Sequence, residues 1–249
     1  MVSAGNIIAL SLIIFIASVV RGFTGFGLAL VAVPLIQFFM PVTDTAVFIA
    51  MINLVFSLIY YRKSKEIVKN QPLGAMAVWT GAGVAAGAVI LKLVNPAYIQ
   101  VIWGLLIIFI VITLARGLDL HIRSERTALT LSGLFGGVLA GATGIIGPPV
   151  AIILSSVNTP KEKFNAIISI FILFAVCYAL LFYMVTGLVR KEIALLALCS
   201  VPALLAGLYA GDRLVSRISQ KTFTTVVYIV LLIMGVITLI KGAKTLFIF

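Results

Sequence analysis

Ten apolar runs follow one another along the chain and are separated by short polar or glycine-rich stretches. They fill residues 7–20, 28–40, 45–61, 72–91, 98–115, 127–140, 149–157, 164–186, 193–210 and 223–240. Several reach or approach the roughly 20 residues with which an α-helix crosses a bilayer. Only 10% of the residues are charged, whereas a soluble domain carries about 25%. The sequence therefore predicts an all-α, polytopic membrane protein.

Two glycine-rich stretches interrupt this pattern. The first, residues 21–27, reads Arg-Gly-Phe-Thr-Gly-Phe-Gly, and the second, residues 141–149, reads Gly-Ala-Thr-Gly-Ile-Ile-Gly-Pro-Pro. Each glycine costs a helix about 1 kcal/mol relative to alanine, so both stretches are expected to break a helix. Within a membrane, broken backbone is tolerated only where it is buried in protein or lines a cavity. Two broken helices at matching places in two halves of a chain indicate a transport site.

Three short motifs recur in the second half of the chain, which predicts an internal repeat. Gly22-x-Thr24-Gly25 recurs as Gly141-x-Thr143-Gly144, Gly83-x-x-x-Gly87 as Gly207-x-x-x-Gly211, and residues 112–114 as 237–239. We predict a first membrane repeat over residues 1–118, a polar connector over 119–126 and a second repeat over 127–249. Each repeat is expected to hold one glycine-broken or re-entrant helix pair and three full spans. The glycine pairs four residues apart are expected to pack helices closely.

The net charge of +11 is explained by short cytoplasmic loops, which carry an excess of Lys and Arg in membrane proteins, and not by nucleic-acid binding. If the second repeat is inverted, the loops around residues 62–69, 116–126, 161–163 and 213–221 share one side and carry 12 Lys and Arg, against five on the other. Parallel repeats would give 11 against 6. The charge distribution favours inversion, with both termini outside, by a narrow margin, and both arrangements stay open.

The two breaks predict an anion site. A helix N-terminus exposes unsatisfied backbone N–H groups and about half a positive charge, and glycine lets a small anion approach them. Threonine hydroxyls and the Arg21 guanidinium would add donors, and Asn53 lies deep in its span. The predicted substrate-binding residues are Arg21, Gly22, Thr24, Gly25, Gly27, Asn53, Gly141, Thr143, Gly144 and Gly147. The competing interpretation is that these glycines serve helix packing alone. The second break is expected to be one residue longer than the first.

Catalysis is not expected. The chain has one histidine, His121 in a polar loop, and two cysteines, Cys177 and Cys199, in apolar spans. All seven carboxylates fall in loops or at helix ends, so no nucleophile with a base, no carboxylate pair and no metal cluster is predicted. No cofactor or metal is expected. A proton relay through the membrane normally needs an acid or histidine at depth, and none is predicted.

The first break, followed by Val33-Pro34, resembles the opening of the sulfite exporter TauE/SafE family, and Gly141-Ala142-Thr143-Gly144 resembles that family's second repeat. The resemblance covers nearly the whole chain. It implies a multi-pass permease of the cell inner (plasma) membrane that exports small sulfur-containing anions such as sulfite or organosulfonates. The expected partners are the anion and the lipid bilayer, with a homodimer left open. The alternatives are a passive anion channel and a membrane scaffold that transports nothing.

Overall fold

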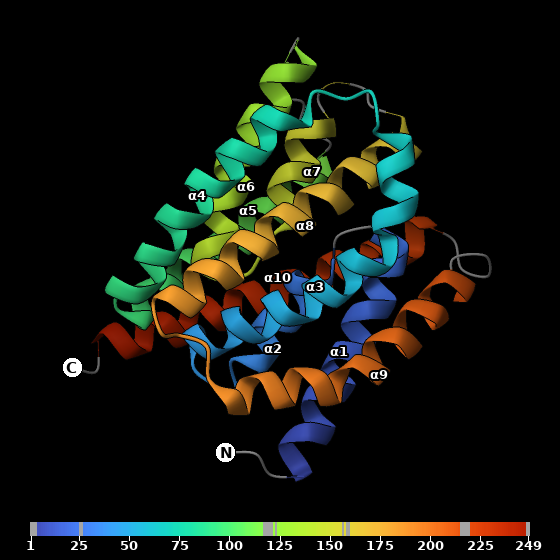
Figure 1. Ribbon diagram of the computed structural model, residues 1–249. Coiled ribbons are helices and arrows are strands. Elements are labelled where there is room, and N and C mark those ends of the chain that lie inside the picture. Colours follow the sequence, from blue (N-terminus) through green and yellow to red (C-terminus); the bar gives the residue numbers. More distant parts are fainter. Residues whose placement is uncertain are drawn as a thin grey trace.

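The computed structural model describes residues 4–24, 27–116, 122, 124–155, 157, 160–214 and 220–247, and these residues form an all-helical protein (Figure 1). Its helices are α1 (Ala4–Thr24), α2 (Leu28–Ile36), α3 (Val42–Ile67), α4 (Leu73–Leu93), α5 (Pro96–Arg116), α6 (Glu125–Thr143), α7 (Gly147–Ser155), α8 (Lys161–Val185), α9 (Lys191–Leu214) and α10 (Gln220–Phe247). No strand occurs in this part of the chain, and six of its helices are long and apolar enough to cross a membrane. The prediction of an all-α membrane protein is confirmed.

Both glycine-rich stretches separate a long helix from a short one. The short helices α2 and α7 have nine residues each, which at 1.5 Å per residue is about 13 Å, less than half of a 30 Å hydrocarbon core. Three residues separate the helices at each break, 25–27 and 144–146. The expectation that the second break is longer was wrong. Gly147 is the first residue of α7, and Pro148 and Pro149 follow it in the first turn, where proline is tolerated.

Closely packed glycines join α4 to α6. A Cβ on Gly83 would lie 2.4 Å from the Leu134 carbonyl oxygen, and one on Gly87 would lie 2.2 Å from that of Val138. The contacts advance together along both helices, so α4 and α6 run parallel. The predicted packing role of this glycine pair is therefore supported by geometry.

The corresponding glycines of the second half join α9 to α1. A Cβ on Gly207 would lie 2.5 Å from the Phe15 carbonyl oxygen, and one on Gly211 would lie 2.9 Å from that of Val19. These two helices also run parallel. The two pairs therefore correspond: each joins the fourth helix of one half of the chain to the first helix of the other half.

Two further pairs join equivalent helices of the two halves. In the α5–α10 pair, Gly104 lies against Gly235 and Leu239, whereas Gly242 lies against Ala97 and Val101. These two helices are therefore antiparallel. Helices α3 and α8 also pack together, and the C-terminal part of α3 meets the N-terminal part of α8 (Figure 1).

The contacts between helix ends define two ends of the molecule. At one end, here called the cation-rich end, α3, α5 and α9 finish and α6 and α8 begin, with Lys163 bound to Glu125 at 2.6 Å. At the opposite end, Asp44 at the start of α3 forms an ion pair with Arg190, just before α9, and this hydrogen bond raises the pKa of Arg190. The Lys241 ammonium there donates to the Gln37 carbonyl oxygen at 2.8 Å. Because Gln37 follows α2, that helix turns back from the break toward the opposite end.

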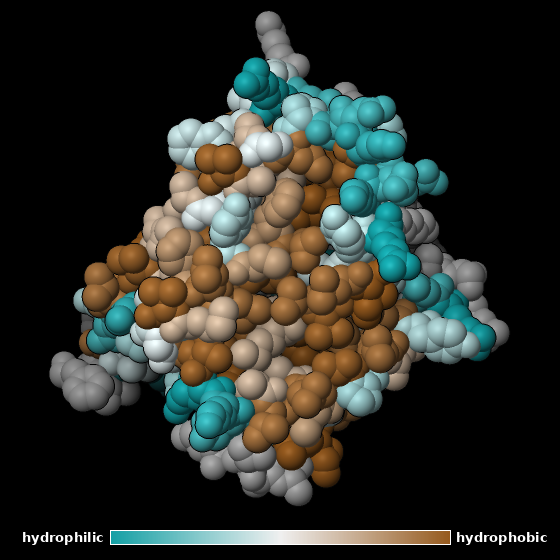
Figure 2. All heavy atoms as spheres, viewed as in Figure 1, coloured by the Kyte–Doolittle hydropathy of each residue, from teal (hydrophilic) through white to brown (hydrophobic). Residues whose placement is uncertain are grey.

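A broad hydrophobic surface covers the flank of the molecule, and hydrophilic residues gather along its upper and right-hand edges (Figure 2). Large apolar side chains are exposed on the outer helices, among them Val78, Val185 and Leu198 at 69%, 78% and 67%. Lys65 and Arg213 lie over the rings of Tyr61 and Tyr209 near the cation-rich end. Aromatic rings beside cations are typical of a membrane–water boundary.

Candidate functional site

Arg21, in the last turn of α1, is only 3% exposed although it carries a full charge. Its Nη1 donates to the Asn53 Oδ1 atom of α3 at 3.4 Å. Its guanidinium carbon lies 3.3 Å from the centre of the Phe56 ring, and that ring stacks on Tyr60 at 4.6 Å. Burial of an ion is costly without a partner. The aromatic stack and one long hydrogen bond are weak compensation for a buried guanidinium.

Three buried donor atoms at this point have no hydrogen-bond partner among the described residues. They are Nε and Nη2 of Arg21 and Nδ2 of Asn53, whose side chain is 1% exposed. The ion pairs found in the described part of the chain, Lys163–Glu125 and Arg190–Asp44, do not include Arg21. A planar guanidinium with free N–H groups matches the oxygens of an oxyanion. The arrangement therefore fits a small anion.

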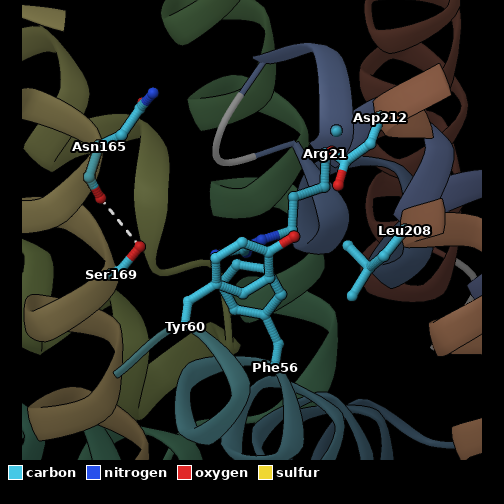
Figure 3. A pocket seen from close by; sticks show the side chains of 8 residues that line it. Arg21, Phe56, Tyr60, Asn165, Ser169, Leu208 and Asp212 are labelled. Atoms are coloured by element: carbon cyan, nitrogen blue, oxygen red, sulfur yellow. Dashed lines mark hydrogen bonds between the residues drawn. The ribbon is translucent and has the colours of Figure 1, made fainter. Parts of the chain in front are cut away.

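A cavity of about 170 Å³ adjoins Arg21 (Figure 3). It is lined by Arg21, Gly22, Phe56, Tyr60, Asn165, Ser169, Leu208 and Asp212. A second cavity of about 260 Å³ shares Tyr60, Asn165 and Ser169 with the first and continues to Ser64, Ile67 and Glu162. Those last residues lie at the end of α3 and the start of α8. The two cavities therefore lead from Arg21 toward the cation-rich end.

Asn53 and Phe56 place the site along α3. Asn53 is eleven residues after Val42, the first residue of α3, which corresponds to about 16 Å along the helix axis. The apolar part of α3 covers Val42–Arg62, so the Arg21 guanidinium meets α3 near the middle of its membrane span. Serine and threonine hydroxyls nearby are satisfied locally, as at Ser57, which donates to the Asn53 carbonyl oxygen at 2.7 Å.

The second break differs from the first in its chemistry. Gly144 has a left-handed backbone, φ +73°, and its N–H donates to the Ala140 carbonyl oxygen at 3.0 Å. The Thr143 hydroxyl donates to the Leu139 carbonyl oxygen and accepts from the Ile145 N–H at 3.1 Å. Pro148 and Pro149 follow Gly147 and have no N–H. The hydrogen-bonding groups expected to hold an anion here are largely used within the chain or missing.

Ala140 stands 119 positions after Arg21, at the equivalent place of the second half. The fully buried Tyr183 hydroxyl donates to the Gly141 carbonyl oxygen at 2.7 Å and lies 3.3 Å from that of Ala140. The Tyr183 hydroxyl, a neutral donor, thus pairs with the carbonyl groups at the end of α6. At the matching position the first half of the chain carries the Arg21 guanidinium. A charged side chain therefore lies at the first break, whereas the matching position at the second break is an alanine.

The structure gives the predicted residues of the first break, together with Asn53 and Gly141, different surroundings. Arg21, Asn53 and Gly22 meet at the cavity or beside it. Gly22 and Gly141 also pack helices: a Cβ would lie 3.0 Å from the Gly211 backbone and 2.3 Å from the Val84 carbonyl oxygen, respectively. Gly27 caps α2, with its carbonyl oxygen 3.3 Å from the Val31 N–H. Gly25 and the Thr24 side chain lie outside the described residues.

The predicted substrate-binding residues did not include Phe56, Tyr60, Asn165, Ser169 or Asp212. Asn53, Phe56 and Tyr60 follow at intervals of three and four, which places them on one face of a helix. That spacing was visible in the sequence. Asp212 directly follows Gly211, the glycine that packs against α1 at Gly22, and only the tertiary contact reveals its place.

Comparisons with known proteins agree with this architecture. The family model described as Sulfite exporter TauE/SafE matches residues 10–238. No curated protein and no solved structure matches the chain.

Proposed function

Because the chain belongs to the sulfite exporter TauE/SafE family, whose members transport sulfur anions across membranes, we propose that it is a secondary transporter that holds its anion at Arg21 and Asn53. The observation that carries this proposal is the buried Arg21 guanidinium with two unpartnered donor atoms, next to a third on Asn53. Hydrogen bonds to charged groups contribute about 1.5–3 kcal/mol each. Three such bonds are enough to hold a sulfite or sulfonate group.

We further propose that the two halves are inverted repeats. An axis in the membrane plane makes equivalent helices antiparallel, and the directions of α5 with α10 and of α3 with α8 support this. Gly144 lies beside Ala46 and Ile49 of α3, whereas Arg21 reaches Asn53. The two breaks are therefore offset along α3 by four to seven residues, about 6–10 Å, as expected for a site between them.

The cavities and the polar contacts at the opposite end support alternating access rather than an open channel. The cavities continue from Arg21 toward the cation-rich end. At the opposite end, the Arg190–Asp44 ion pair and the Lys241–Gln37 hydrogen bond link neighbouring segments of the chain. The positive-inside rule assigns the cation-rich end to the cytoplasm of an inner-membrane protein. The anion would then reach Arg21 from the cytoplasm, which is the direction of export.

A thermal-unfolding panel of the purified protein tests the proposal with sulfite, organosulfonates, thiosulfate and sulfate. A ligand present at a hundred times its Kd stabilises the folded state by about 2.7 kcal/mol, so at least one sulfur anion should raise the unfolding temperature. Absence of any shift would contradict anion binding and favour a scaffold. Counterflow of labelled substrate in proteoliposomes distinguishes the mechanisms, since a carrier shows exchange and an open pore does not.

The second break is tested by Gly144→Val with Gly187→Val as its matched control. Both glycines have φ +73°, and a side chain in this conformation costs about 1–2 kcal/mol, so both variants should lose similar stability. A Cβ on Gly144 would contact Ile49 at 3.4 Å, whereas one on Gly187 has nothing within 4 Å. We expect Gly144→Val to reduce sulfite flux about tenfold or more and Gly187→Val to leave it near wild type. Equal flux in both would remove the second break from the mechanism.

A further inference from the structure

We propose that Asp212 makes the Arg21 cavity selective for oxyanions that also carry a hydrogen-bond donor, an N–H or O–H group. This inference rests on the proposed anion site and specifies which anions the site accepts. Its basis is that a carboxylate shares the lining of the cavity with the guanidinium.

The packing of α9 against α1 fixes this arrangement. A Cβ on Gly22 would lie 3.0 Å from the Gly211 backbone and 3.3 Å from the Asp212 backbone nitrogen. Asp212 is therefore held one residue beyond the glycine contact and beside Arg21 (Figure 3). The described ion pairs do not include it, so its carboxylate does not neutralise the guanidinium directly.

The charges along the route are unusual for an anion pathway. Arg21 is the cation that lines the inner cavity, Asp212 is the carboxylate beside it, and Glu162 lines the outer cavity. The other polar lining groups, on Tyr60, Ser64, Asn165 and Ser169, are neutral. A bare dianion would meet two negative groups, on the exposed side chains of Asp212 and Glu162, and one positive group, and like charges repel each other. The lining therefore disfavours an anion that offers only acceptor atoms.

An ionised carboxylate accepts hydrogen bonds and donates none. A ligand with an oxyanion at one end and an N–H or O–H group at the other satisfies both charged residues: its oxygens accept from Arg21 and Asn53, and its donor reaches Asp212. A site built around a hydrogen bond discriminates against ligands that lack the matching group, because its polar atom is then left unpaired. Asp212 thus acts as a specificity-determining residue.

Three sulfonates of matched size test this on the full-length protein: propane-1-sulfonate, 2-hydroxyethanesulfonate and 2-aminoethanesulfonate, which differ only in a terminal methyl, hydroxyl or ammonium group. Wild type should bind at least one of the two donor-bearing ligands about tenfold more tightly than propane-1-sulfonate, a difference of about 1.4 kcal/mol. In Asp212→Asn the preference should fall to about twofold or less, mainly because propane-1-sulfonate binds better. Tighter binding of the amino ligand identifies a zwitterion, and tighter binding of the hydroxy ligand identifies a monoanion.

Glu192→Gln is the matched control, since it removes one negative charge from the opposite end of the same helix and should keep the preference. Equal affinities for all three ligands in wild type, or a preference that survives in Asp212→Asn, would overturn the role of Asp212 and leave the anion site standing. If wild type binds none of the sulfonates and Arg21→Gln changes no anion response, the proposed function itself fails.

Discussion

Replacing Arg21 with glutamine is expected to abolish anion-dependent stabilisation and to lower sulfite flux at least a hundredfold. Two charge-assisted hydrogen bonds are lost, each worth about 1.5–3 kcal/mol, together with the positive charge of the site. The ligand-free protein should be as stable as wild type or more stable, because a buried charge without a full partner costs free energy. This opposite effect on binding and on stability separates a ligand residue from a structural one.

The measurement is thermal unfolding with and without sulfite, followed by flux in proteoliposomes. Arg21→Lys keeps the charge but loses the planar fork of donors, so it should retain a reduced response. Arg213→Gln is the control, because Arg213 lies over Tyr209 and does not line the cavity. A variant Arg21→Gln that keeps the full anion response, or that fails to fold while Arg213→Gln is normal, would refute the assignment.

The second large effect is expected at the α4–α6 contact, where Gly87→Ala should prevent folding to a monodisperse protein. The new Cβ would lie 2.2 Å from the Val138 carbonyl oxygen and 2.7 Å from the Ala142 nitrogen. Both are backbone atoms, so the two helices must move apart along their whole contact. Overpacking a well-packed site commonly costs about 1–3 kcal/mol, and a backbone clash of this depth should exceed that range.

Gly74→Ala provides the same substitution on the same helix without the contact, because a Cβ on Gly74 has nothing within 4 Å. Alanine in a helix is favoured over glycine by about 1 kcal/mol, so this variant should be slightly more stable than wild type. Size-exclusion profiles and detergent-unfolding curves of the two variants give the comparison. A monodisperse Gly87→Ala with wild-type unfolding would show that the helices separate more easily than their packing implies.

Local sequence features predicted the helices, both breaks and the packing glycines well. Apolar runs, glycine clusters and small residues four apart each act through neighbouring residues, so their structural effect is readable from a short stretch. The first break pointed to Arg21, and the depth of Asn53 in its span pointed to α3.

The composition of the site depended on contacts between distant segments. Arg21 and Asp212 are brought together because Gly211 packs on Gly22, and no local pattern fixes that pairing. The motif alone also does not show how the hydrogen-bonding groups of the second break are used. Matching Gly and Thr residues predict matching anion donors, and in the structure the Thr143 hydroxyl forms hydrogen bonds with Leu139 and Ile145 of its own segment.

The pairing of α1 with α9 and of α4 with α6 has a consequence for how the protein is made. Each half places its first and fourth helices against partners from the other half, so neither half encloses an interior of its own. During synthesis the face of α1 that packs against Gly207 and Gly211 stays uncovered until α9 has entered the membrane, nearly 200 residues later. Assembly therefore finishes only near the end of translation, and a chain truncated before α9 would be a substrate for membrane quality control.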